Sequence, residues 1–133
     1  MDFYNHTRKL FANGEVTLTN LKVVLVNAYT FSATQTNLTN VTAAQVSGNG
    51  WAAGGQPIAS AAITVEGANA KLDGNDISVT AAGGEIGAAT ALVVVDATSS
   101  KPLFHFAFPS SQTAGEGTPF NINWNAAGIA NWS

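Results

Sequence analysis

Short apolar segments with a period of two, separated by turn residues, restrict the fold of this 133-residue chain more than any other feature. Alternating apolar and polar side chains are typical of a strand with one buried face, and short continuous apolar runs are typical of a central strand. The longest apolar runs are residues 21–26 and 86–95, and no long helical segments alternate with them. The pattern predicts an all-β fold, an antiparallel, jelly-roll-like β-sandwich with a short N-terminal helix or arm.

The other predicted strands are shorter and lie between turn signals. They cover residues 15–19, 57–65, 70–72, 76–80, 103–108 and 120–124, and residues 109–117 are expected to form a polar loop. Asp73 and Gly74 are a favoured pair for a tight turn, which predicts a hairpin from the strands on either side of them. The expected core consists of residues on apolar strand faces, namely Val23, Leu25, Ile63, Val93, Val95, Phe104, Phe106 and Ile122.

Residues 3–13 are the best helix candidate in the sequence. Asp2 can cap the first turn, and Gly14 supplies a stop. We therefore divide the chain into an N-terminal arm or short helix, residues 1–14, and a single β-sandwich domain, residues 15–133. The arm either packs on the sandwich or docks on a partner, and the sequence leaves both possibilities open.

The composition argues against several classes of function. Only 10% of the residues are charged, the net charge is −3, and the chain has 5 Lys and Arg in total. Such a chain cannot form the basic face that phosphate binding requires, so we expect no nucleic-acid partner. The apolar runs are too short to cross a bilayer as a helix, so we expect no membrane partner. A surface of neutral and small side chains is typical of a protein that packs against other proteins.

The sequence offers no clear catalytic or metal-binding constellation. His6 and His105 are the two histidines, and neither has acidic or histidine neighbours at ligand spacing. We expect His105 to be half-exposed on the sheet face opposite Phe104 and Phe106. Asp73, Asn75 and Asp76 resemble part of a calcium loop, but the later Gly and bidentate Glu are missing, so a plain turn is preferred. We expect no enzymatic activity and no cofactor.

Four segments, in this order along the chain, carry a family resemblance. They are NHTRKLFANG at 5–14, LKVVL at 21–25, QVSGNGWAAGGQ at 45–56 and FNINWNAAGI at 120–129. The chain resembles the head decoration, or cement, proteins of tailed bacteriophages. In that family an aromatic residue is frequent at the position of Val79 and tyrosine is common at the position of Trp51, which limits the transfer of single residues.

The resemblance implies a protein made in the host cytoplasm and located in the virion, on the outer surface of the phage head. There it would bind across major capsid protein subunits, reinforce the expanded shell and associate with itself as a dimer or trimer. Aromatic residues close to both chain ends are candidate anchors for such contacts. The candidate capsid or subunit contacts are Phe3, Tyr4, Arg8, Lys9, Phe11, Trp51 and Trp132. The alternative is a tail or fibre-associated module that binds a bacterial surface carbohydrate with Trp51 and nearby loops.

Overall fold

Two apolar strands, β2 (Leu21–Val26) and β8 (Ile86–Asp96), form the centre of the protein. The computed structural model describes residues 1–132 and is an antiparallel all-β sandwich, with 47% of residues in strands and 11% in two short helices. The first sheet has the order β1-β9-β8-β2-β3, and β4 also pairs with β2. The bounds of its other strands are β1 Asp2–Phe3, β3 Gln45–Val46, β4 Gln56–Pro57 and β9 Lys101–Ala114.

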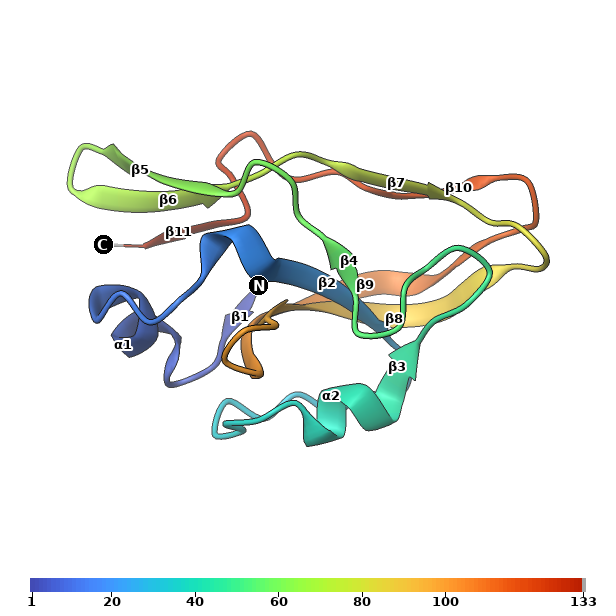
Figure 1. Ribbon diagram of the computed structural model, residues 1–133, viewed down its shortest axis with the longest axis horizontal. Helices are drawn as coiled ribbons and strands as arrows, with labels where there is room; N and C mark the ends of the chain where they lie inside the picture. Colours follow the sequence, from blue (N-terminus) through green and yellow to red (C-terminus); the bar gives the residue numbers. More distant parts are fainter. Residues whose placement is uncertain (133) are drawn as a thin grey trace.

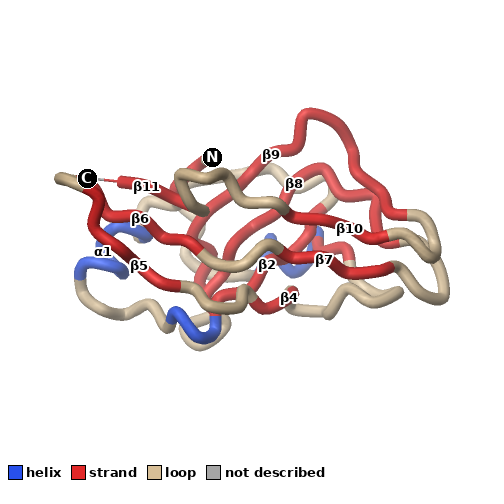
Figure 2. The backbone as a smooth tube through the Cα atoms, turned by 90° about the horizontal axis from the view of Figure 1, so that it is seen from above, coloured by secondary structure: helices blue, strands red, loops and turns tan. Residues whose placement is uncertain are grey.

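The second layer consists of two smaller antiparallel sheets that cover one face of the first (Figure 1). One has the order β11-β6-β5, with bounds Ala130–Trp132, Asn69–Asp73 and Ala62–Glu66. The other pairs β10, Pro119–Ile122, with β7, Ile77–Thr80. Seen from above in Figure 2, the two small sheets lie end to end over the first sheet, and the β5–β6 hairpin is at the end where the chain terminates.

Both faces of the first sheet are covered, which explains why β2 and β8 are apolar along most of their length, with Lys22 and Thr90 as interruptions. Toward the second layer, the sheet buries a set that includes Leu21, Val23, Leu25, Leu92, Val94 and Phe104. The opposite face buries Val24, Val26, Val93 and Val95 together with Tyr4 and Val41. Helix α2 (Thr39–Ala44) lies on that second face (Figure 1). The protein therefore has two apolar clusters, one on each side of its central strands.

Most of the expected core residues are buried, with one clear error. Val23, Leu25, Val93, Val95, Phe104 and Ile122 are buried. Ile63 is 39% exposed, because β5 is an edge strand and its inner face extends past the part of the first sheet that could cover it. Phe106 is only half-buried, with its ring 5.9 Å from the ring of Trp124 in the space between the layers.

The N-terminal segment differs from the predicted helix over residues 3–13. Helix α1 spans Thr7–Ala12, and the chain before it forms β1, which pairs with β9 through Asp2–His105 and Phe3–Phe104. Asp2 caps no helix, because it lies in β1 and α1 begins only at Thr7; its carboxylate instead binds the ring of His105. The predicted half-exposure of His105 is also wrong, because its ring is buried beneath the rings of Phe31 and Tyr29.

Four further local predictions are wrong where long-range pairing overrides a local signal. Residues 15–19 form no strand, and the 3₁₀ helix η1 (Leu18–Asn20) precedes β2. The predicted 70–80 hairpin does not form, because β6 pairs with β5 and β11 whereas β7 pairs with β10. Residues 57–65 are divided between β4 and β5, and β9 continues to Ala114 through the expected 109–117 loop.

Candidate interaction surface

Aromatic residues from four separate segments meet at one end of the sandwich. We call Phe3, Phe11, Phe104 and Trp132 the aromatic cluster; they come from β1, α1, β9 and β11. Trp132 lies 5.0 Å from Phe11 and 6.1 Å from Phe3, measured between ring centroids, and Phe3 lies edge-on to Phe104 at 5.0 Å. Phe104 is fully buried, whereas the other members of the cluster are half-buried. The cluster thus joins the two chain ends to each other and presents part of its area to solvent.

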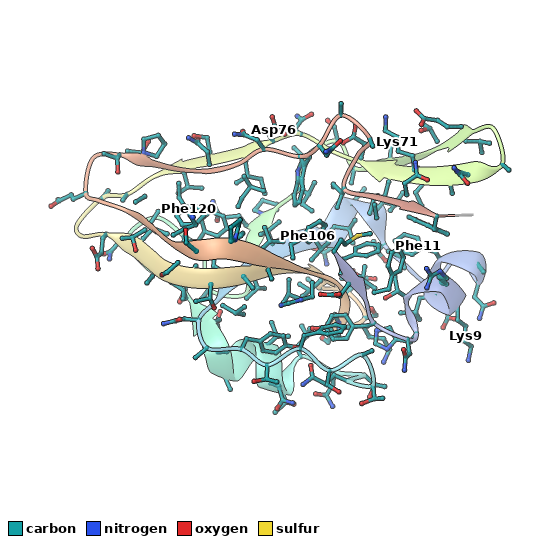
Figure 3. All side chains as sticks on the ribbon, turned by 180° about the vertical axis from the view of Figure 1, so that it is seen from behind. Lys9, Phe11, Lys71, Asp76, Phe106 and Phe120 are labelled. Carbon is teal, nitrogen blue, oxygen red and sulfur yellow. The ribbon has the colours of Figure 1, made fainter. Side chains whose placement is uncertain are left out.

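Helix α1 adds two exposed cations beside this cluster. The guanidinium of Arg8 lies 4.1 Å from the centroid of the Phe3 ring, a cation–π contact that fixes the position of the charge. Lys9 is exposed, and in Figure 3 it points away from the sandwich at the end where Phe11 points between the layers. The first turn of α1 has no acidic residue. This end of the molecule therefore combines accessible aromatic area with adjacent positive charges.

Tyr4, a predicted contact residue, lies inside the protein. It is fully buried, its hydroxyl is 2.5 Å from the hydroxyl of Tyr29, and the Tyr29 hydroxyl in turn donates to the side-chain oxygen of Gln35. Burial, and then the hydrogen bond to Tyr29, raise the pKa of Tyr4 far above its ordinary value. Burial also raises the pKa of Tyr29, and the hydrogen bond with Tyr4 acts against that rise. Tyr4 therefore stabilises the fold and is inaccessible to a partner.

The predicted role of Trp51 in contacts, or in a sugar-binding shelf, also fails because its side chain is buried. Its exposed fraction is 2%, and its ring packs edge-on against Phe120 at 5.5 Å. The indole Nε1 has no hydrogen-bond partner among the described residues 1–132. A buried ring cannot stack on a sugar face, so Trp51 does not supply the aromatic platform that the carbohydrate-binding alternative assigns to it.

The β11-β6-β5 sheet carries an apolar inner face that is partly exposed, although the sequence predicts Ile63 on this face to lie in the core. The register places Val65, Ala70 and Trp132 in one row across the sheet and Ile63, Leu72 and Ala130 in the next row on the same face. Leu72 and Ala130 are buried, but Ile63 is 39% and Val65 is 80% exposed. We call Ile63 and Val65 the β5 strip. The alternation of apolar and polar residues over 62–66 predicts that Ile63 and Val65 share one face of a strand. It cannot show that no other element covers that face.

A groove of about 260 Å³ opens between β9 and β10, at the other end of the sandwich. Phe108, Pro109, Pro119 and Phe120 supply its apolar walls, and Gln112 and Asn121 supply amides. None of these residues was predicted to be functional. The groove is lined by neither a charged side chain nor a histidine, the groups that most often act as general acid or base.

Among the described residues 1–132, no group of three or more His, Cys, Asp or Glu side chains is arranged to hold a metal ion. In the same part of the chain, no helix has the length and apolarity needed to cross a membrane. The comparisons of the chain with protein-family models, with curated proteins and with solved structures found no match. The aromatic cluster, with Arg8 and Lys9 beside it, is the candidate interaction surface of the protein.

Proposed function

We propose that this protein is a virion structural protein that decorates and stabilises the head of a tailed bacteriophage by binding across major capsid protein subunits. The observation that carries the proposal is the meeting of Phe3, Arg8, Lys9, Phe11 and Trp132 at one end of the sandwich. Aromatic residues and arginine are the side chains most enriched at the energetic centres of interfaces. The sequence resemblance to decoration proteins supports the same proposal and implies that the partner is the major capsid protein.

The low charge of the whole chain fits this mode of action. A shell presents many copies of the same site, so a modest contact repeated by symmetry is sufficient to reinforce it. Contacts of this kind require shape complementarity and a few anchors, and they require no reacting group. The half-buried rings of the aromatic cluster supply rigid anchors, and the cations of α1 supply a charge that an acidic patch on a capsid subunit could pair with.

Co-sedimentation of the purified protein with empty expanded heads tests the proposal. Replacing both Arg8 and Lys9 by alanine removes exposed groups, so the thermal midpoint should stay close to that of the unchanged protein. Attachment to heads should weaken by about tenfold or more, as expected for loss of a single interface anchor. Lys71→Ala is the matched control, because it removes one cation from the outer face of the second layer and should leave attachment unchanged.

Two results would overturn the proposal. One is failure of the intact, folded protein to attach to expanded heads. The other is equal attachment by the Arg8 and Lys9 variant and the control, which would remove α1 from the contact. Retention of the intact protein on a bacterial surface polysaccharide, without attachment to heads, would instead support the carbohydrate-binding alternative.

A further inference from the structure

The free edge of β5 is the most exposed apolar feature of the described chain. Within residues 1–132, β6 is the single strand that pairs with β5, and all five residues of β5, Ala62–Glu66, are exposed. The remaining edge strands are each two to four residues long or, in the case of β9, interrupted by Pro109 and by shifts of register. Short length, proline, bulges and charged side chains are the devices that prevent edge pairing. Of these, β5 has only one, the charge of Glu66 at its hairpin end.

The register of the β5–β6 hairpin shows which backbone groups are free. Gly67 and Ala68 form a two-residue turn, with φ of +63° at Gly67, so Glu66 and Asn69 are the hydrogen-bonded pair that closes the hairpin. Hydrogen-bonded pairs alternate along an antiparallel ladder. Ala62, Thr64 and Glu66 therefore direct their backbone groups toward β6. Ile63 and Val65, the β5 strip, direct their N–H and C=O groups to the free edge.

We propose that β5 pairs antiparallel with β5 of a second copy of this chain, about a two-fold axis at Thr64. This register uses the whole strand and places Ile63 opposite Val65 of the second copy, so that the free N–H and C=O groups of both strips pair. Ala62 then faces Glu66 of the second copy. The inner faces of the two β11-β6-β5 sheets become continuous, and the exposed side chains of the β5 strip cover each other.

The charges of the strand are compatible with this partner. Glu66 is the single charged residue of β5, and it already pairs with Lys71 of its own chain, at 3.3 Å between Nζ and Oε1. The two-fold register places Glu66 opposite a neutral alanine and keeps it away from Glu66 of the second copy. Because the contact uses the same surface on both copies, it closes at two chains and does not propagate into a fibre. A dimer would present two α1 surfaces, which links this inference to the proposed attachment to a symmetric shell.

A single cysteine tests the register directly, because the chain has no cysteine of its own. In the proposed pair, Thr64 faces Thr64 of the second copy as a non-hydrogen-bonded pair, with Cα atoms about 4.5 Å apart, which is within disulfide range. Thr64→Cys should therefore form a covalent dimer under mild oxidation. Ala62→Cys is the matched control on the same strand and face, and its two cysteines would lie too far apart to bridge. Equal cross-linking of the two variants would overturn the register.

Two lysine substitutions on the same strand should have opposite effects on the dimer. Val65→Lys places an ammonium group on the apolar inner face and should weaken dimerisation by about tenfold or more, whereas Ala62→Lys places one opposite Glu66 of the second copy and should strengthen it severalfold. Both positions are exposed, so neither change should unfold the chain.

Sedimentation equilibrium of the free protein, without heads, measures this association independently of the proposed function. A dimer that responds to the two lysine variants in opposite directions is the expected result. A monomer at all concentrations up to about 1 mM, a trimer, or equal responses of the two variants would overturn the inference. Loss of head attachment by Val65→Lys with a monomeric parent would assign the β5 strip to the capsid and would overturn it as well.

Discussion

At the scale of single residues, burial separates the side chains that hold the fold from those available to a partner. Phe104 and Phe106 are two positions apart on the same face of β9, yet Phe104 is fully buried and Phe106 is half-buried. Phe104→Ala should lower the free energy of unfolding by about 3–5 kcal/mol, and Phe106→Ala by roughly half as much. Urea unfolding of both variants measures the difference. Equal losses would show that the second layer covers Phe106 as completely as Phe104.

Tyr4 gives the protein a predictable alkaline instability. Its folded-state pKa is raised by burial and by the hydrogen bond to Tyr29, whereas a tyrosine in the unfolded chain titrates near pH 10. Above about pH 10 the unfolded state releases a proton that the folded state retains, so the free energy of unfolding falls as pH rises.

Tyr4→Phe removes this titrating group and should make the alkaline decline shallower. Tyr29 still contributes to the decline, because its pKa is also raised by burial. Urea midpoints of the two proteins at about pH 8 and pH 11 provide the measurement. A decline of equal steepness in the variant would show that Tyr4 titrates normally in the folded protein.

At the scale of elements, the two chain ends are parts of the sandwich. β1 pairs with β9, α1 buries Leu10, and β11 pairs with β6. Deletion of residues 1–13 removes the buried side chains of Tyr4 and Leu10, and it should lower the thermal midpoint by more than about 10 °C. A midpoint within a few degrees of the intact protein would show that the N-terminal segment is a separable arm.

Point substitutions on α1 separate packing from surface chemistry without removing the segment. Leu10 is 7% exposed, so Leu10→Ala should lower the free energy of unfolding by about 2–4 kcal/mol. Lys9→Ala on the exposed side of the same helix should change it by no more than about 0.5 kcal/mol. Chemical unfolding measures both, and comparable effects would mean that the two faces of α1 are assigned wrongly.

The elements that were predicted correctly are those with strong local signals. β2 and β8 have mostly apolar runs because both faces of their sheet are covered, and such runs are visible in any sequence. The hairpin was placed at Asp73 and Gly74 although it forms at Gly67, because local turn propensity cannot choose between two nearby turns. Pairing with β11 and β10 decides between them, and these strands lie about a third to a half of the chain away.

The sequence predicts the individual residues of the candidate surface but not that they lie together. Phe3, Phe11 and Trp132 stand out in the sequence as aromatic residues near chain ends, but their meeting depends on the β1–β9 and β11–β6 pairings. Trp51 is also an aromatic residue that the sequence marks as a candidate contact, but its side chain lies in the core. Residue type alone therefore could not separate a surface aromatic residue from a core one.

At the scale of the whole molecule, the proposed attachment surface and the proposed self-pairing edge of β5 are two separate features of one sandwich. The aromatic cluster and α1 lie at the end of the sandwich where the β5–β6 hairpin also lies, while the face bearing Lys71 points outward from the second layer (Figures 1 and 3). A dimer through β5 would present two attachment surfaces, and avidity would then make head attachment stronger than a single contact allows. On expanded heads, Val65→Lys should therefore attach more weakly than the unchanged protein, and the Thr64→Cys cross-linked dimer should attach at least as strongly as it.

Cryo-electron microscopy of phage particles produced with this protein is the sharpest test of the proposed attachment to the head. The account predicts that copies of the sandwich occupy symmetry-related positions on the outer surface of the head, each in contact with more than one major capsid protein subunit. In the resulting map the aromatic cluster and the exposed side of α1, with Arg8 and Lys9, should face the shell. A virion whose shell lacks this density, or a map that places the sandwich in the tail, would contradict the account.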